Sequence, residues 1–264
     1  MLDLPGIPRA LLGGTAAFRR HLDWDRAIRT PVASVRRIGV VHLVGEAGAT
    51  MLTHELVRAA VRRRQGPVLA VDLSETGRLA GRLGVVGTTE VRGRRLIRTS
   101  AEAEAALQRI GPRVWGARPH PGGGVADAWS RHIAPVMRFH EIAMVDLGRR
   151  DPERDLEAAA ALCDGVCVVA PAERRAAEAA RVVAEAVAAM PEHPSTVLAL
   201  VDREGTARGV PRTIRAHTGL PLVQVPRDAG LAHGGVARSL AARQAMLQLA
   251  ALLIAAPSTE EDAA

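Results

Sequence analysis

A short glycine-containing segment lies where a chain can bind a phosphate group. Gly45–Gly48 (GEAG) follows an apolar run at 38–44, typical of a buried strand, and precedes a helical stretch at 50–64. A loop between a strand and the amino-terminal end of a helix presents backbone N–H groups to an anion. The segment therefore predicts an anion-binding loop.

The loop keeps only part of the phosphate-binding pattern G-x-x-x-x-G-K-[ST]. Gly48 matches the last glycine and Thr50 the magnesium-binding hydroxyl. Ala49 stands at the lysine and Leu43 at the first glycine. No arginine between residues 38 and 57 could take over from that lysine. We therefore expect the loop to lack its usual cation.

Other chemical signatures are weak. The nine histidines show no H-E-x-x-H motif or other metal-ligand spacing, and no G-x-S-x-G motif occurs. Cys163 and Cys167 flank and enter an apolar run at 165–169, which predicts buried packing residues. The pattern argues against a metalloenzyme, a serine hydrolase and a disulfide-stabilised domain.

The positive charge is carried entirely by arginine. The chain has 264 residues, 35 Lys+Arg with no lysine among them, 28 Asp+Glu and a net charge of +7. The densest basic run is Arg92-Gly93-Arg94-Arg95 with Arg98, which we interpret as a solvated face. Aromatic residues make up 2%, too few for a single-strand stacking platform. Sequence-nonspecific DNA binding through phosphate contacts stays an alternative.

Strand and helix patterns alternate along the chain. This order predicts an α/β fold, with a doubly wound, mostly parallel sheet and helices on both faces. The expected strands are 38–44, 68–72, 96–99, 114–117, 142–146, 165–170, 196–201 and 222–225. The expected helices are 50–64, 76–84, 101–110, 125–138, 152–162, 172–190, 208–217 and 236–255.

The alternating pattern occupies residues 36–257, which predicts one domain. Residues 1–35 form an expected amino-terminal extension, partly helical, with an amphipathic helix at 8–25 that packs on the domain. Residues 258–264 are expected to be a disordered acidic tail. No apolar run reaches about 18 residues and no signal-peptide pattern begins the chain, so we expect a cytoplasmic protein.

Several segments resemble the ParA/MinD family of deviant P-loop ATPases (SIMIBI-like P-loop NTPases). The resemblance covers about residues 30–255 and is strongest to the MinD-like proteins of GC-rich actinobacteria, several of them linked to type VII secretion. The matching segments are Arg29–Pro31, Arg37–Val41, Val68–Asp72 with Gly77, Leu79 and Gly84, Ile142–Gly148, Cys163–Pro171, Pro221–Asp228 and Leu231–Gly234.

The resemblance implies a nucleotide site made by five residues. Gly45, Gly48, Thr50, Asp72 and Asp146 match its phosphate loop, its second-strand aspartate and its Walker B aspartate. Thr50 and Asp146 would bind Mg²⁺ if a nucleotide binds. The alternative is that these residues are vestigial, with the glycines kept for the turn and the aspartates as strand-end caps.

The departures fall on the residues that the family uses for chemistry. Against its motif K-G-G-x-G-K-T-[ST], Val44 replaces the signature lysine, Glu46 the second glycine, Ala49 the P-loop lysine and Met51 the last hydroxyl. Ser74 replaces the second aspartate of the D-x-D motif. The carboxylate of Glu46 would repel a triphosphate.

These observations predict a ParA/MinD-like protein that has lost ATP hydrolysis. It would act as a scaffold or regulator through a protein partner, in secretion, polarity or septum placement. We expect no required cofactor, weak ATP and Mg²⁺ binding at most, a nucleotide-independent homodimer if any, and membrane contact only through a partner. One alternative is a nucleotide-binding switch or slow ATPase, and a second is a nonspecific DNA-binding partition-type protein.

Overall fold

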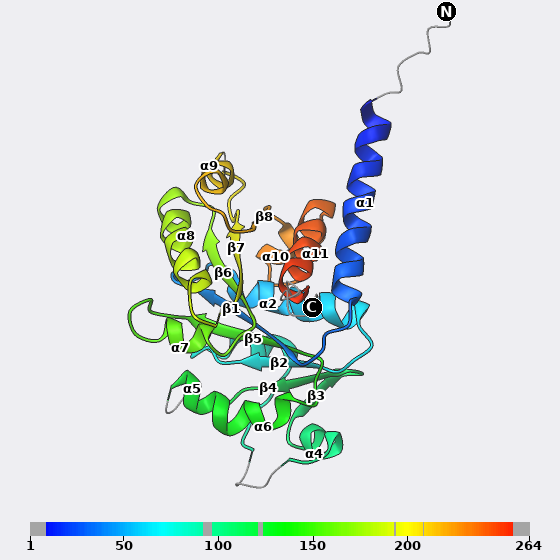
Figure 1. Cartoon of the computed structure of the whole chain (residues 1–264), viewed down its shortest axis with the longest axis vertical. Coiled ribbons are helices and arrows are strands. Elements are labelled where there is room, and N and C mark those ends of the chain that lie inside the picture. The colour runs from blue at the N-terminus through cyan, green and yellow to red at the C-terminus, as the bar shows by residue number, and fades with distance from the viewer. Residues whose placement is uncertain (1–8, 92–96, 121–123, 193, 208, 256–264) are drawn as a thin grey trace, which may run out of the picture.

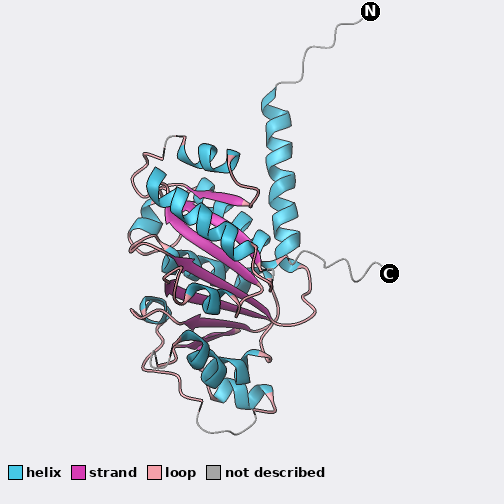
Figure 2. Cartoon of the chain, turned by 60° about the vertical axis from the view of Figure 1, so that its left-hand side comes forward, coloured by secondary structure: helices cyan, strands magenta, loops and turns pink. Residues whose placement is uncertain are grey.

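The computed structural model describes residues 9–91, 97–120, 124–192, 194–207 and 209–255. Its centre is an eight-stranded sheet in the order β3-β4-β2-β5-β1-β6-β7-β8 (Figures 1 and 2). Neighbouring strands from β4 to β8 are parallel, and only the edge strand β3 is antiparallel. The strands are β1 (Arg36–His42), β2 (Val68–Asp72), β3 (Gln108–Gly111), β4 (Val114–Ala117), β5 (Ile142–Arg149), β6 (Gly165–Pro171), β7 (Ser195–Val201) and β8 (Leu222–Val225).

Helices cover both faces of the sheet, which confirms the predicted fold class. One face packs on α2 and α11, and the other on α5 to α8. The helices are α1 (Arg9–Arg29), α2 (Ala49–Arg63), α3 (Arg78–Leu83), α4 (Ser100–Ala105), α5 (Val125–Ala128), α6 (Ala134–Met137), α7 (Leu156–Ala160), α8 (Arg174–Ala188), α9 (Val210–Ala216), α10 (Ala229–Ala232) and α11 (Leu240–Ile254), with a π-helical turn (Trp129–Ile133) joining α5 to α6.

The two cores follow from the alternation of side chains along the central strands. Val40 and Val41 of β1 are both fully buried, but they belong to clusters on opposite faces of the sheet. Parallel strands covered on both faces read as continuous apolar runs, which is why 38–44 and 165–170 were recognisable in the sequence.

The predictions for residues 96–110 are wrong in part. The expected helix at 101–110 stops at Ala105, because the chain reverses and residues 108–111 pair with β4 as the edge strand β3. The described part of the expected strand 96–99 is irregular, and Thr99 instead caps α4 by accepting a hydrogen bond from the Glu102 N–H at 3.2 Å. Leu96 lies outside the described residues.

The helix α1 is longer than predicted and projects from the body of the molecule (Figure 1). Its carboxyl-terminal end packs on α11 and α2, where Ile28 is fully buried. The buried Arg64 at the end of α2 holds it there by donating hydrogen bonds to the carbonyls of Ile28 and Thr30. Phe18 and Leu22, farther along α1, are 62% and 44% exposed.

Within the described ranges, no helix combines the length and apolar character needed to cross a membrane. The predicted acidic tail at 258–264 lies outside those ranges.

Candidate functional site

The predicted anion-binding loop connects β1 to α2. Gly48 directly precedes α2 with a left-handed φ of 94°, a conformation that glycine adopts without steric cost. No side chain caps this end of α2. The first-turn N–H groups, which have no partner within a helix, are therefore left for a ligand or solvent.

Thr50 and Asp146 meet at the start of α2. The Thr50 hydroxyl donates to the Asp146 carboxylate at 2.7 Å, and the Gly148 N–H donates to its other oxygen at 3.0 Å. Burial raises the pKa of Asp146 to about 6, and the nearby Asp72 carboxylate adds to the rise, although the Thr50 and Gly148 hydrogen bonds oppose it. Asp146 is fully buried, yet at neutral pH it is mostly ionised and able to attract a cation.

Asp72 supports the local fold. Its carboxylate accepts hydrogen bonds from the Ser74 N–H and hydroxyl and from the Ala80 N–H, which ties the end of β2 to α3. Ser74 packs so closely on Gly148 that a Cβ at Gly148 would lie 2.9 Å from the Ser74 Cα. Asp72 therefore makes the hydrogen bonds of a strand-end cap, and its role toward a nucleotide stays a prediction.

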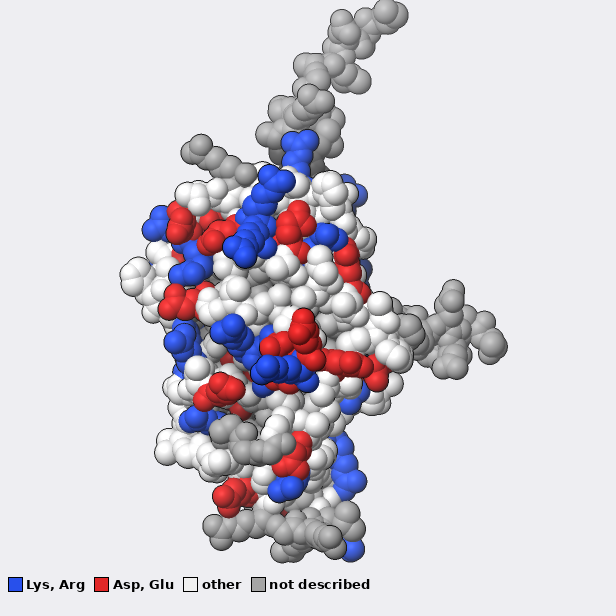
Figure 3. All heavy atoms as spheres, turned by 90° about the vertical axis from the view of Figure 1, so that its left-hand side faces the viewer, with Lys and Arg blue, Asp and Glu red and all other residues white. Residues whose placement is uncertain are grey.

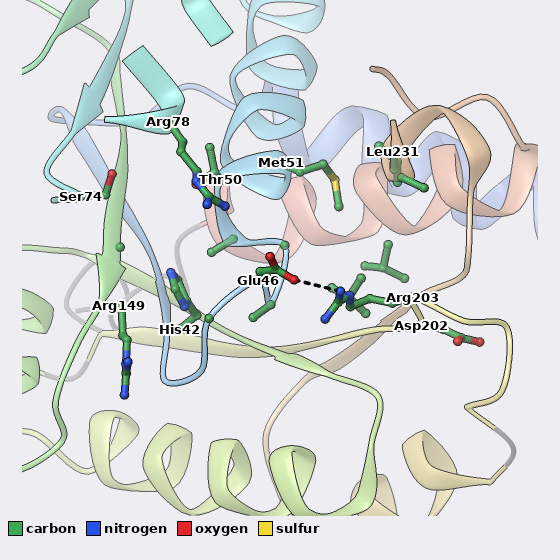
Figure 4. Close-up of a pocket in the computed structure, with 18 of the residues that line it drawn as sticks. His42, Glu46, Thr50, Met51, Ser74, Arg78, Arg149, Asp202, Arg203 and Leu231 are labelled. Carbon is green, nitrogen blue, oxygen red and sulfur yellow. Dashed lines mark hydrogen bonds and ion pairs between the residues drawn. The ribbon is translucent and has the colours of Figure 1, made fainter. Parts of the chain in front are cut away.

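A cavity of about 650 Å³ opens beside the loop (Figure 4). This volume is within the range of small-molecule sites. Of the predicted residues, Gly45, Gly48 and Thr50 line the cavity, whereas Asp72 and Asp146 are not among the lining residues. Asp146 reaches it only through its hydrogen bond to Thr50.

Five arginines line the same cavity, and sequence reasoning missed all of them. They are Arg78, Arg82, Arg149, Arg203 and Arg227. Arg149 is the last residue of β5, and Arg203 and Arg227 follow the ends of β7 and β8. Arg78 and Arg82 lie on α3, the helix after β2. Ligands of open α/β sheets bind outside the carboxyl ends of the strands. Applied to the sequence, that rule would have pointed to Arg78, Arg149, Arg203 and Arg227 as residues near a ligand.

Glu46 and Arg203 face each other across the cavity. The Glu46 carboxylate lies 3.3 Å from an Arg203 guanidinium nitrogen, as the dashed line in Figure 4 shows. Glu46 has a left-handed φ of 58°, uncommon for a residue with a side chain. Both side chains are largely exposed, at 69% and 46%, so the ion pair contributes at most about 1 kcal/mol.

Arg78 extends toward Thr50 in Figure 4, whereas Arg149 points away from it. Arg78 makes no hydrogen bond or ion pair with the described part of the chain. The Arg149 Nε donates to the Leu43 carbonyl at 3.1 Å. Burial lowers the pKa of His42, and the positive charges of Arg149, Arg150 and Arg78 lower it further. This end of the cavity is therefore electropositive.

The two positions matched to the family's lysines carry no charge. Ala49 is 3% exposed within the core cluster, and Val44 presents an apolar side chain to the surface. Thr50 and Asp146 supply oxygen atoms of the kind that Mg²⁺ prefers. Among the described residues no group of three His, Cys, Asp or Glu side chains is arranged to bind a metal.

Two further features named in the sequence are the cysteine pair and the basic run around Arg92. Cys163 and Cys167 are buried free thiols, and burial raises the pKa of Cys163 to about 12. Arg92, Arg94 and Arg95 of the basic run lie outside the described residues. On the face in Figure 3 arginines and acidic side chains are interspersed, with no large field of one sign.

No protein-family model matches this chain, and no curated protein does either. Solved structures do resemble it. The ParA family ATPase from Chlorobium tepidum TLS superposes with a TM-score of 0.63 at 18% identity, over 81% of this chain and 98% of that one. A chain of the MinC:MinD cell division protein complex from Aquifex aeolicus gives a TM-score of 0.63 at 17% identity, over 82% of this chain and 94% of that one.

A third structure, an ATP complex of a Cyanothece McdA variant, gives a TM-score of 0.62 at 11% identity, over 86% of this chain and 99% of that one. Identities this low establish the fold alone. The sheet, the loop and the helices are arranged as in the fold of P-loop NTPases. More specifically, the chain has a ParA/MinD-type fold.

Proposed function

We propose that this ParA/MinD-like P-loop protein has lost ATP hydrolysis and acts through protein contacts as a scaffold or regulator. Its process would be secretion, polarity or septum placement, in the cytoplasm or at a membrane reached through a partner. Any homodimer would form without nucleotide. In the family the signature lysine reaches the partner's nucleotide, and in this chain Val44 stands at that position.

The observation that carries this proposal is the charge of the loop. Val44 and Ala49 are apolar, and Glu46 adds a carboxylate that lines the cavity. Phosphoryl transfer depends mainly on positioned positive charge around the phosphate oxygens. The loss of one charge-assisted hydrogen bond weakens binding by about 1.5–3 kcal/mol, or roughly 10- to 100-fold. Two missing cations and one added anion make turnover by the usual family mechanism untenable.

The exposed part of α1 supports a role in protein contacts. Phe18 and Leu22 present apolar side chains to solvent on a helix that projects from the domain. Phe18 and Leu22 are four residues apart and so lie on the same face of α1, where they could form part of a contact with a protein partner.

The test is phosphate release from ATP and Mg²⁺ by the purified chain, with Asp146→Ala as the matched control. We expect both proteins to release phosphate at the same background rate. Turnover that Asp146→Ala abolishes would refute the loss of hydrolysis. Light scattering with and without ATP tests the dimer, and a dimer that forms only with ATP would contradict a nucleotide-independent contact.

A second candidate function is a nucleotide-binding switch that binds without turnover. The kept hydrogen bond between Thr50 and Asp146 and the open 650 Å³ cavity favour it. Calorimetry with ATP and Mg²⁺ tests it, with Thr50→Val as the variant that removes the hydroxyl. Submillimolar affinity that drops in the variant supports the switch, and undetectable binding to both rules it out.

A further inference from the structure

The helix α1 presents a face that the body of the molecule leaves uncovered. It precedes the segment, about residues 30–255, that resembles the ParA/MinD family, and it projects from the domain in Figure 1. Phe18 is 62% exposed and Leu22 is 44% exposed. Because they are four residues apart, their side chains are neighbours on the helix surface. This apolar pair is stabilised when a partner removes it from water.

A row of arginines runs beside the apolar pair. Arg19 lies three residues before Leu22 and Arg26 lies four residues after it, so both flank that leucine. Arg19 is exposed and makes no hydrogen bond or ion pair with the described part of the chain. The Arg26 guanidinium lies 3.7 Å from the Asp23 carboxylate, but these side chains are 81% and 66% exposed, so the pair is weak. The row therefore offers positive charge to a partner.

The base of α1 is fixed by contacts on its other side. Asp25 accepts hydrogen bonds from Arg63 of α2 at 2.8 Å and from Arg29 at 2.6 Å. Ile28 is fully buried, and Trp24 packs against the same core cluster. A helix that is already ordered binds a partner without the entropy loss of ordering it.

The charges favour an acidic partner over a second copy of this chain. Two α1 helices that met through this face would bring two copies each of Arg19 and Arg26 around one apolar patch, and like charges repel. An amphipathic helix binds through apolar residues at helical spacing, and charge complementarity selects the partner. A bilayer surface requires a wide apolar face along the helix, whereas in residues 16–29 the exposed large apolar side chains are Phe18 and Leu22.

We propose that Phe18, Leu22, Arg19 and Arg26 form a docking face on α1 for an acidic amphipathic helix of a protein partner. The apolar side chains of that helix cover Phe18 and Leu22, and its carboxylates pair with the two guanidinium groups. This inference rests on the function proposed above, in which the chain acts through protein contacts, and it supplies the chemistry of the partner.

The experiment is fluorescence anisotropy at low ionic strength with three labelled peptides of about 20 residues, long enough to form a helix. The acidic peptide has leucines along one face and glutamates beside them. The basic peptide has lysines in place of the glutamates, and the polar peptide has glutamines in place of the leucines. We expect the wild-type chain to bind the acidic peptide with saturation and the other two far more weakly. Added salt should weaken the binding, because the ion pairs are exposed.

Two double variants test the two rows of the docking face. Phe18→Ser with Leu22→Ser should weaken binding of the acidic peptide by at least about 10-fold, because the two side chains are the apolar anchors of the contact. Arg19→Gln with Arg26→Gln should weaken it several-fold at low salt, and this difference should shrink as the salt concentration rises.

Val182→Ser and Arg212→Gln are the matched controls. Val182 is 55% exposed on α8, which packs on the opposite face of the sheet from α11 and α1, and Arg212 is exposed on α9. Each control should change the affinity by less than about 3-fold, as expected from a distant side chain. Circular dichroism and thermal unfolding establish that each variant is folded. The comparison of the three peptides on the wild-type chain depends on no variant.

Three results would overturn the proposal. The first is no saturable binding of the acidic peptide at about millimolar concentration; if vesicles of phosphatidylglycerol then bind the wild-type chain, the face belongs to a membrane. The second is equal binding of the acidic and basic peptides. The third is a loss of affinity in the controls as large as in the folded α1 variants. ATP turnover would refute the loss of hydrolysis and leave these results standing, and failure of the peptide would leave the ATPase result standing.

Discussion

The double variant Glu46→Gly with Ala49→Lys should bind Mg-ATP far more tightly than the wild-type chain. The change restores one cation to the loop and removes one anion from it. The cavity is open beside both positions, and a Cβ at the neighbouring Gly45 meets no atom within 4 Å. The cavity therefore has the volume for a row of phosphates beside the loop.

The size of the gain follows from the two charges. A lysine that reaches a phosphate contributes about 1.5–3 kcal/mol. Removing a carboxylate about 5 Å from a phosphate charge relieves roughly 1–3 kcal/mol at an effective dielectric constant of 20–80. Neighbouring substitutions do not add fully, so we expect at least about a 100-fold gain, or about 3 kcal/mol.

The same variant should stay folded. Relief of the left-handed φ of 58° at Glu46 contributes about 1 kcal/mol. The backbone entropy of glycine and the lost ion pair with Arg203 offset it by a similar amount. Lysine at the buried Ala49 must run its stem into the cavity beside Met51, which makes thermal unfolding the necessary check.

The assay is calorimetry with ATP and Mg²⁺ on four proteins: wild type, each single variant and the double variant. Ala49→Met serves as the control for size without charge and should show no gain. A folded double variant that binds ATP no better than wild type would refute the reasoning. It would mean that the loop no longer presents its N–H groups to phosphates.

Three further predictions concern the fold. Arg64→Leu should lower the free energy of unfolding by about 2–3 kcal/mol in urea, because it orphans two carbonyls and the half-buried Glu141 carboxylate at the base of α1; an unchanged midpoint would contradict that anchoring. Burial raises the pKa of Asp228, but backbone hydrogen bonds from Ser239 and Leu231 outweigh it and lower that pKa to about 2. Its stabilising contribution is therefore complete above about pH 4 and lost as pH falls toward 2, so Asp228→Asn should flatten the acid limb of a urea–pH series. Cys163 and Cys167 should resist a thiol reagent until urea unfolds the chain, and rapid labelling of the native protein would contradict their burial.

The fold was predictable because its signals are local. Buried parallel strands appear as apolar runs, and the glycine loop lies within a dozen residues of both elements that frame it. Residues 96–111 were harder, because an edge strand such as β3 is defined by its partner β4 and not by its own pattern. The left-handed backbone conformation of Glu46 was equally hard to predict, since it depends on the loop around it.

The candidate site was predictable only where its residues are near one another in the sequence. Gly45, Gly48 and Thr50 follow from the loop pattern, and all three line the cavity. Residues 38–57 contain no substitute cation. The cavity arginines Arg78 and Arg203 lie on segments that follow other strands of the sheet, so a search near the loop could not find them. Pairing across such distances is set by topology, which short motifs do not encode.

The absence of lysine has a structural consequence at Ala49. An arginine codon was as available there as at the 35 other cationic positions, yet the position is apolar and 3% exposed. A guanidinium group is larger and planar, and at the first residue of α2 it would have to fit beside Met51 and Val201, which line the same cavity. A long arginine side chain can reach the cavity from a residue that lies farther from the loop. Arg78 and Arg203 have that reach, so in a chain without lysine the cations of this cavity come from its walls, and the loop itself is left with a carboxylate.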